Sequence, residues 1–517
     1  MKFQKWLDQF ACGIITFLSF LICLSLGIIS LFFMARMQVE KFEEFIPEPV
    51  KPTQRHFIPA LAVAALLMLL LIGATLAAKK FVTWKSAKLF AGCCAASVFV
   101  FCLFWMNSYT NEPAGDQEIV WKIAKQLAGV SQIDDWIYEY LRMHPYQASI
   151  AMVMEVFIRL FGQSTFSWQI VSALGASACV LLCSSLAARV TNSPCAKALC
   201  AVLLLGFFPL AMYSNFIYGT LSGIALALLG IYAVFRECDA AKRKSKVLWW
   251  MCAVIAFTSA IILYKGEEIF LIAAALTLFA MGMTRRKEKV KMLAAIGIVA
   301  IALVLCNAWQ GIAMHRMGMA NDPGCPLLPR ILMGVDAYSE VPVPGFCNGI
   351  HEKIFRECNY DAAEANRICV THIRNSLVNL HKQGRFFAFF AEKTADQWLE
   401  PWYGGLTMSN PAIYNEPNAF AQSMIGGNAF AVVNGWLSTL MPVIYLSAAA
   451  GIFVIWKNKN IKLYCLLPMI CLIGGFLFQL MAEAKARYCM PYYLCCFPMA
   501  AAGIAALAEK LAKKQNP

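Results

Sequence analysis

Charged residues are scarce in this chain of 517 residues. Only 14% of them are Asp, Glu, Lys or Arg, whereas 60% are hydrophobic. A soluble domain cannot bury that much apolar surface, but helices that contact lipid can expose it. The shortage of charge therefore excludes an ordinary soluble enzyme and favours an integral membrane protein.

Motifs that bind nucleotides or build common hydrolases are also missing. The sequence has no Walker A motif and no strand-linked GxGxxG, so ATP-driven transport and nucleotide-sugar binding inside the membrane lose support. The six histidines lack HExxH spacing. No Ser/His/Asp order stands out either, so the function must be sought in other residues.

Apolar runs long enough to cross a membrane recur along the whole chain. A helix needs about 20 apolar residues to cross a ~30 Å hydrocarbon layer. The runs predict an all-α polytopic membrane protein with about twelve transmembrane helices. The predicted spans cover residues 11–34, 57–78, 88–107, 165–188, 196–213, 216–235, 247–264, 267–283, 290–312, 431–456, 463–481 and 488–508. The first run is too long for a signal-peptide core and lacks a clear cleavage site, so we expect a retained span.

Basic residues concentrate in alternate loops. Clusters of lysine and arginine follow the second, sixth, eighth and tenth predicted spans, and three more lysines close the chain. With twelve spans, all of them lie on the same side as Lys2 and Lys5. The positive-inside rule makes that side cytoplasmic, so we expect a cell-membrane protein with both termini in the cytoplasm. The net charge of +14 is then mainly a topology signal rather than a nucleic-acid interface.

This topology divides the chain into four parts. Residues 1–87 hold two N-terminal spans, and 88–312 form a transmembrane core that includes a first outer loop at 108–164. Residues 313–430 form a large extracytoplasmic loop, and 431–517 hold the last spans and a cytoplasmic tail. Every cluster that mixes acidic and basic residues with His, Trp or Tyr lies on the outer face, which points to function there.

Both outer loops carry helical patterns. Apolar residues recur on one helical face after Asp116, and the stretch 149–161 is strongly apolar. Two such helices after a span are expected to lie along the membrane surface. A charged helical pattern covers 362–392, and Trp398 and Trp402 after it are suited to an interfacial lid or an aromatic belt.

Most of the 21 cysteines lie inside predicted spans, where cysteine behaves as a small hydrophobic residue. Four others lie in the large outer loop: Cys325, Cys347, Cys358 and Cys369. They allow three disulfide pairings, between which the sequence does not choose. They lack the CxxC spacing of a zinc site, so no metal ligands are predicted among them.

Five short motifs follow one another on the outer face. They are GDQE at 115–118, HPY at 144–146, FIRLFG at 157–162, YKGE at 264–267 and EAKARY at 483–488. In this order they resemble GT-C glycosyltransferases, the superfamily of protein O-mannosyltransferases and the lipid A aminoarabinose transferase, and in particular Gram-positive members. The resemblance covers most of residues 88–508. The chain departs from the pattern in having two extra spans before Asp116, Asp-Gln-Glu in place of a paired Asp-Glu, and His-Pro-Tyr in place of Lys-Pro-Pro.

The resemblance implies that Asp116 is the catalytic base, with Glu118 as a second acidic candidate. An ordinary carboxylate is sufficient, because proton transfer can come late in an oxocarbenium-like transition state. Each residue has a simpler alternative. Asp116 could cap the helix that follows, since Asp is favoured there, and Glu118 fits a solvated first-turn residue.

The same resemblance implies a set of substrate-binding residues. They are His144, Tyr146, Lys265, Glu267, Glu483, Arg487 and Tyr488. The leaving phosphate of the donor is already anionic, so it needs cations more than an acid, and arginine or lysine can supply them. The simpler alternatives are headgroup contact for Lys265 and Arg487, pairing of Glu267 with Lys265, a loop role for His144 and an aromatic-belt role for Tyr488.

The expected function is an inverting glycosyltransferase on the extracytoplasmic face of the cell membrane. Nucleotide sugars are absent there, so we expect a polyprenyl-phosphate sugar as donor and a cell-envelope polymer, lipid or protein as acceptor, with no nucleic-acid partner. No cofactor is identified with certainty, and a divalent cation is left open. The alternative is a secondary transporter or lipid-linked glycan flippase, against which the long outer loop, the surface helices and the lack of an internal repeat count.

Overall fold

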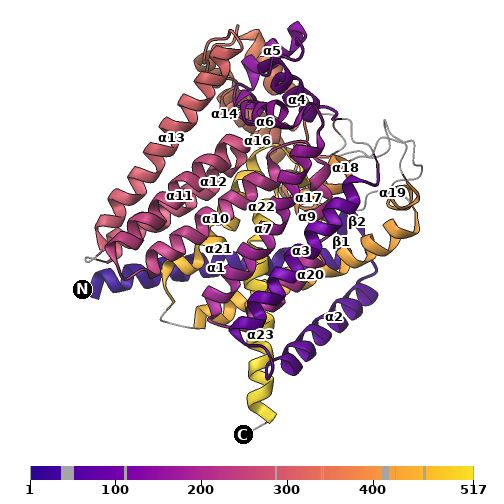
Figure 1. Ribbon diagram of the computed structural model, residues 1–517, viewed down its shortest axis with the longest axis vertical. Helices are drawn as coiled ribbons and strands as arrows, with labels where there is room; N and C mark the ends of the chain where they lie inside the picture. The colour runs from indigo at the N-terminus through magenta and orange to yellow at the C-terminus, as the bar shows by residue number, and fades with distance from the viewer. Residues whose placement is uncertain are drawn as a thin grey trace.

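The computed structural model describes residues 2–35, 52–109, 113–285, 288–338, 341, 343–409, 418–425, 427–457 and 461–515. These residues are mainly helical (Figure 1). In the described strands, β1 (Phe33–Ala35) pairs antiparallel with β2 (Pro52–Gln54), with Met34 opposite Thr53. The fold is thus all-α apart from this short ribbon.

Within the described residues, eleven helices are long and apolar enough to cross a membrane, or twelve if one bent pair is counted as a span. The bent pair is α8 (Pro194–Leu205) and the segment Pro209–Asn215, which begins with α9 (Pro209–Met212), at 60°. The other spans are built on α1 (Lys2–Phe32), α2 (Phe57–Ala78), α3 (Trp84–Met106), α7 (Phe166–Thr191), α10 (Thr220–Asp239), α11 (Arg243–Leu263), α12 (Glu268–Thr284), α13 (Val290–Arg316), α20 (Asn428–Lys457), α21 (Leu467–Met481) and α23 (Cys496–Gln515). The predicted all-α polytopic fold is confirmed.

Burial distinguishes central helices from peripheral ones. In the most apolar stretch of α10, α20 and α23, 72% of the residues are buried, against 11% in α2 and 17% in α13. Accordingly, α2 and α13 lie at opposite edges of the bundle (Figure 1). Small residues allow the central helices to approach closely: a Cβ at Gly451 of α20 would lie 2.1 Å from the carbonyl oxygen of Met499 in α23.

Two groups of shorter helices connect the spans. The first group lies between α3 and α7 and comprises α4 (Asp116–Leu127), α5 (Asp135–Met143) and α6 (Gln147–Phe161). The second lies between α13 and α20 and comprises α14 (Leu327–Val335), α15 (Ile350–Glu357), α16 (Ala362–Lys382), α17 (Phe386–Trp398), α18 (Gly405–Met408) and α19 (Ala419–Ser423). Helices α4, α5, α6, α14 and α16 gather at one end of the bundle, and the C-terminus lies at the other (Figure 1). The topology therefore brings the two loops together.

The structure corrects one expectation for the large loop and adds a detail on its cysteines, whose pairing the sequence left open. Trp398 and Trp402 are 1% and 0% exposed and belong to the main hydrophobic core, so the interpretation as a lid or belt was wrong. Their indoles fill the core because the chain after α17 turns inward. The four loop cysteines carry free thiols, and Cys325 and Cys369 are buried in a small core of their own with Leu332 and Phe355.

The basic loops predict which end faces the cytoplasm. A single cysteine at position 353, where the lysine side chain is 72% exposed, should react with an impermeant maleimide on intact cells, as should cysteines at 116 and 487. A cysteine in place of the exposed Lys244 should react only after permeabilisation. The experiment needs a background without native thiols. Labelling of position 116 or 487 only after permeabilisation would overturn this topology.

Candidate active site

Asp116 lies in the first turn of α4, where an acidic side chain is favoured by the helix dipole. Gly115, with φ of 61°, occupies the N-cap position, so Asp116 is not the capping residue. Its carboxylate instead accepts a hydrogen bond of 3.1 Å from the hydroxyl of Tyr140 in α5. The side chain of Asp116 is 40% exposed, which leaves it accessible to a ligand.

Arg487, which is far from Asp116 in the sequence, lies next to it in the structure. It lies in a 3-10 turn, Ala486–Tyr488, that follows α21 and precedes α22 (Met490–Leu494). Its Nη2 is 3.5 Å from Oδ2 of Asp116, and the arginine side chain is 12% exposed. The structure thus brings together the two residues that the sequence singled out as base and phosphate ligand.

The turn that carries Arg487 holds a compact network of charges. Nη2 of Arg487 donates to the Tyr488 hydroxyl at 3.2 Å, and this hydroxyl donates to Oε2 of Glu483 at 3.3 Å. The ammonium of Lys485 lies 3.0 Å from Oε1 of Glu483. Glu483, Arg487 and Tyr488 are therefore neighbours, and Tyr488 contacts the guanidinium instead of serving as a separate belt aromatic.

Asp116 is held from the opposite side by a chain of polar side chains that the sequence did not point to. The Tyr140 hydroxyl accepts from Nε2 of Gln147 at 3.2 Å, and Oε1 of Gln147 accepts from the Tyr218 hydroxyl at 2.6 Å. Nothing in their spacing marks these residues, except that Tyr140 lies one helical turn before His144. This series of hydrogen bonds fixes the orientation of the Asp116 carboxylate.

The surrounding charges keep Asp116 ionised. Part of the Asp116 side chain stays exposed, but the surrounding protein removes water from the rest of it and so raises its pKa. The cations of Arg487 and Lys485 and the hydrogen bond from Tyr140 outweigh this effect, so the pKa of Asp116 lies below the usual value. Burial and the Asp116 charge raise the pKa of Tyr140, which therefore stays a hydrogen-bond donor. Burial raises the pKa of Glu483, but Lys485 and Arg487 bring it below its usual value.

A buried lysine, Lys393, binds the backbone of the segment that leads into the turn with Arg487. The side chain of Lys393 in α17 is 0% exposed, and its ammonium donates to the carbonyl oxygens of Gly334 and Ala482. Burial lowers the pKa of Lys393 to about 7. Nε2 of Gln397, one helical turn further on, donates to the carbonyl of Glu483 at 3.2 Å. Helix α17 thereby holds the segment that presents Arg487.

His144, Tyr146 and Lys265 lie beside this network. The Tyr146 ring is flanked by two cations, with Nζ of Lys265 5.3 Å and the guanidinium of Arg330 5.4 Å from its centroid. Nη2 of Arg330 lies 3.3 Å from Nδ1 of His144, whose ring is 4.7 Å from that of Tyr140. Arg330 is a further basic residue of the site that sequence motifs did not reveal.

Two predicted site residues do not join the cluster. Glu118 pairs with Lys122 at 2.7 Å on the surface of α4, with 43% of its side chain exposed. Residues two apart on a helix do not face each other, so Glu118 points away from Asp116. Glu267 is 1% exposed, and neither of its carboxylate oxygens has a hydrogen-bond partner in the described part of the chain. The predicted pairing of Glu267 with Lys265 was wrong, because the lysine lies over Tyr146.

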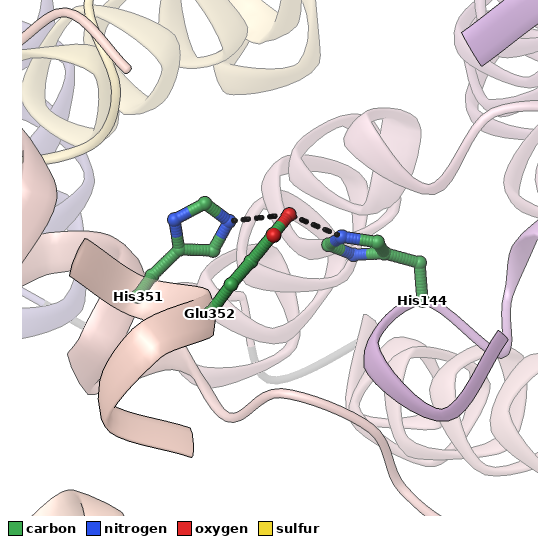
Figure 2. A group of neighbouring side chains, drawn as sticks. All are labelled: His144, His351 and Glu352. Carbon is green, nitrogen blue, oxygen red and sulfur yellow. Dashed lines mark hydrogen bonds and ion pairs between the residues drawn. The ribbon is translucent and has the colours of Figure 1, made fainter. Parts of the chain in front are cut away.

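One group of side chains has the donor atoms of a metal site. His144, His351 and Glu352 converge, and one donor atom from each lies within 4.8 Å of the others (Figure 2). The Glu352 carboxylate lies between the two rings, with Oε1 3.5 Å from Nε2 of His144 and 3.8 Å from Nε2 of His351. Burial lowers the pKa of His351 to about 4, so it is neutral, as a metal ligand must be.

The fit of this group to a metal is incomplete. Two imidazoles and one carboxylate form a ligand set that zinc accepts. However, the Arg330 guanidinium contacts Nδ1 of His144, which places the ring proton of a neutral His144 on Nε2. A metal at Nε2 would require the opposite tautomer and would bring a second positive charge close to Arg330.

A family model matches the middle of the chain. Residues 144–309 match the family described as dolichyl-phosphate-mannose-protein mannosyltransferase, and this match confirms the predicted resemblance to GT-C glycosyltransferases. The match includes His144, Tyr146, Lys265 and Glu267 and leaves Asp116 outside it. No curated protein matches the chain by sequence.

Three solved structures align with most of this chain at low identity. The oligosaccharyltransferase AglB from Archaeoglobus fulgidus, in complex with an inhibitory peptide and a dolichol-phosphate, is 10% identical over 85% of this chain and 52% of its own, with a TM-score of 0.42. The apo oligosaccharyltransferase of that organism is 11% identical over 84% and 52%, with a TM-score of 0.44. ArnT from Cupriavidus metallidurans, in the apo state, is 14% identical over 83% and 78%, with a TM-score of 0.34. The chain spans about half the length of the two archaeal structures.

Proposed function

We propose that this chain is a glycosyltransferase that moves a sugar from a polyprenyl-phosphate donor to a hydroxyl of a cell-envelope polymer, lipid or protein. The observation that carries the proposal is the contact of Asp116 with Arg487 at 3.5 Å, from segments that are far apart in the sequence. Such a transfer needs a base for the acceptor hydroxyl and a cation for the leaving phosphate. The ionised carboxylate of Asp116 can serve as the base, and the guanidinium of Arg487 can serve as the cation.

The carboxylate of Asp116 acts as the base. The acceptor oxygen attacks the anomeric carbon, and its proton passes to Asp116 as the new C–O bond forms. The lowered pKa keeps Asp116 unprotonated at neutral pH. The low basicity is tolerated because the acceptor hydroxyl becomes strongly acidic only as the bond forms. The hydrogen bond from Tyr140 to Oδ1 restricts the orientation of the carboxylate.

Arg487 and Lys485 serve the leaving group. The bond between the anomeric carbon and the phosphate oxygen breaks, and its electron pair remains on the polyprenyl phosphate. The planar guanidinium can bind two phosphate oxygens at once, and the ammonium adds a point charge. Tyr488 and Glu483 hold both cations in place. A single displacement of this kind inverts the anomeric configuration.

The depth of the turn supports a lipid-linked donor. It lies between the candidate spans Leu463–Met481 and Met490–Ala512, and a turn that joins two spans is expected at the level of the lipid phosphates. A transporter would be expected to hold its charged site near the middle of the bilayer. The cluster of Asp116, Glu483, Lys485 and Arg487 instead lies at span ends, which favours the transferase over the flippase.

We predict that transfer does not depend on a divalent metal, because the site already contains the cations of Arg487 and Lys485. Asp116 and Glu483 pair with Arg487 and Lys485, which neutralise charge where a metal would otherwise do so. Treatment of the purified protein with a chelator should leave the initial rate of transfer unchanged. A rate that disappears on chelation and returns with zinc or manganese would contradict this prediction and would make His144, His351 and Glu352 the first candidates for the ligands.

The proposed function is tested with purified protein in detergent and a panel of radiolabelled polyprenyl-phosphate hexoses, with solubilised cell envelope as the source of acceptor. We expect label from at least one donor to move to the acceptor fraction. The appearance of label should require both the protein and an unmodified acceptor hydroxyl. Failure of every donor in the panel, with folded protein, would contradict the proposal.

A further inference from the structure

The end of the bundle opposite the candidate active site contains a hollow with strongly basic walls. It has a volume of about 630 Å³ and lies where α3 and α8 begin and where α7, α10 and α20 end. Helix α3 runs from this hollow, at Trp84, to the loop before Asp116, a distance of about 34 Å at 1.5 Å per residue. The hollow is therefore separate from the candidate active site, and nothing in the proposed transfer uses it.

Positive charge is in excess around the hollow. Among the described residues that line it, five are basic and one is acidic: Lys88, Arg189, Lys197, Arg236, Lys462 and Asp239. The one carboxylate is already bound, because Asp239 pairs with Arg189 at 2.7 Å and accepts a hydrogen bond from the Tyr464 hydroxyl. Among the described lining residues, no further acid is present to neutralise the remaining cations.

Lys197 is the least expected of these cations. It is 8% exposed, and its ammonium donates to the Ser185 hydroxyl at 2.8 Å. No carboxylate acts on it in the part of the chain that the structure describes. A basic residue that served only as a topology signal would extend into water, whereas burying an ammonium without a counter-ion is costly. Its placement is explained if an anion enters the hollow.

The hollow also has apolar walls beside its charges, as expected for a site that binds an amphiphilic molecule. Trp84, Ile455 and Ile461 contribute apolar surface beside the charges. Tyr232 holds two guanidinium groups in place: Arg189 lies 5.1 Å from its ring centroid, and Nη1 of Arg236 donates to its hydroxyl at 3.3 Å. The arginines are thus oriented before any ligand arrives, which reduces the ordering cost of binding.

We propose that this hollow binds the phosphate headgroup of an anionic phospholipid in the leaflet that faces the basic loops. Basic pockets between transmembrane helices on that side of a membrane are suited to anionic headgroups. The cations would contact the phosphate, and Trp84 and the isoleucines would contact the glycerol and the first part of the acyl chains. The inference is independent of sugar transfer and would stand if that function were different.

The test compares two double variants that remove the same charge. Lys88→Gln/Lys462→Gln removes two exposed lysines that line the hollow, and Lys85→Gln/Lys244→Gln removes two exposed lysines of the same face that do not. Native mass spectrometry of the purified proteins with phosphatidylglycerol should show one tightly bound lipid on the wild type and on the control. At ~1 kcal/mol for each basic residue, the test variant should bind this lipid about 30-fold more weakly.

Two further measurements, with phosphatidylcholine and with inorganic phosphate, identify the class of ligand. Phosphatidylcholine, which is zwitterionic, should bind more weakly than phosphatidylglycerol, and inorganic phosphate should neither compete with the lipid nor raise the melting temperature. Equal binding by the two double variants, or equal binding of the two lipids by the wild type, would overturn the proposal. Saturable stabilisation by inorganic phosphate, which Lys88→Gln/Lys462→Gln abolishes, would also overturn it by assigning the hollow to a soluble phosphate.

Discussion

Asp116→Asn should slow sugar transfer about 10²–10⁴-fold, the usual cost of losing a general base. Asparagine keeps the shape of the side chain and can still accept a hydrogen bond from Tyr140. It cannot take a proton from the acceptor. Donor binding should change little, because the phosphate contacts lie on Arg487 and Lys485, so the loss should appear in kcat rather than in KM.

Glu118→Gln is the matched control for this variant. It removes the same charge from the same helix, two residues away, where the side chain is exposed and pairs with Lys122. Its transfer rate should be near that of the wild type. Melting temperatures of both variants show whether they are folded. A folded Asp116→Asn protein with a near wild-type rate would remove the base assignment, whereas a loss in Glu118→Gln alone would move that role to Glu118.

Arg487→Ala should reduce transfer about 10²–10³-fold, as expected when one preorganised group that stabilises developing charge is lost. Arg487→Lys keeps the positive charge but loses the bidentate geometry, so an intermediate loss is expected. Free polyprenyl phosphate should compete with the donor for the wild-type site. Both changes should weaken this inhibition, since the arginine contacts the leaving phosphate. The comparison is made at constant ionic strength with the same donor.

Arg367→Lys is a suitable control, because this arginine is 74% exposed and lies on α16 in the same outer loop. It should transfer sugar at the wild-type rate. If Arg487→Lys and Arg487→Ala both used the donor normally, the side chain would only be extending to lipid headgroups, and another cation would have to hold the phosphate.

The spans were predictable from the sequence because apolar length is a local property. Each predicted span has a helical counterpart in the structure, including the bent pair around Pro209. The separation of Glu118 from Asp116 also follows from local geometry, since residues two apart point to different sides of a helix. Similarly, Lys265 and Glu267 occupy one 3-10 turn, in which residues two apart are rotated by about 120° from each other.

The supporting residues were not predictable, because their role depends on contacts between distant segments. Tyr140, Gln147 and Arg330 have no distinguishing spacing, and they acquire a role only when α5, α6 and α14 meet at one end of the bundle. Trp402 was misplaced for a related reason. An aromatic residue beside proline after an amphipathic helix is typical of a membrane interface, but here the segment turns into the core.

The central claim is that the bond between sugar and phosphate is broken at Asp116 and Arg487. The release of free polyprenyl phosphate from a radiolabelled polyprenyl-phosphate sugar, measured with wild-type protein in proteoliposomes, tests it most directly. We predict one polyprenyl phosphate released for each sugar transferred, with Glu118→Gln behaving as the wild type and Asp116→Asn nearly inactive. Movement of the sugar lipid across the bilayer with its sugar–phosphate bond intact, at equal rates in wild type and Asp116→Asn, would contradict the account.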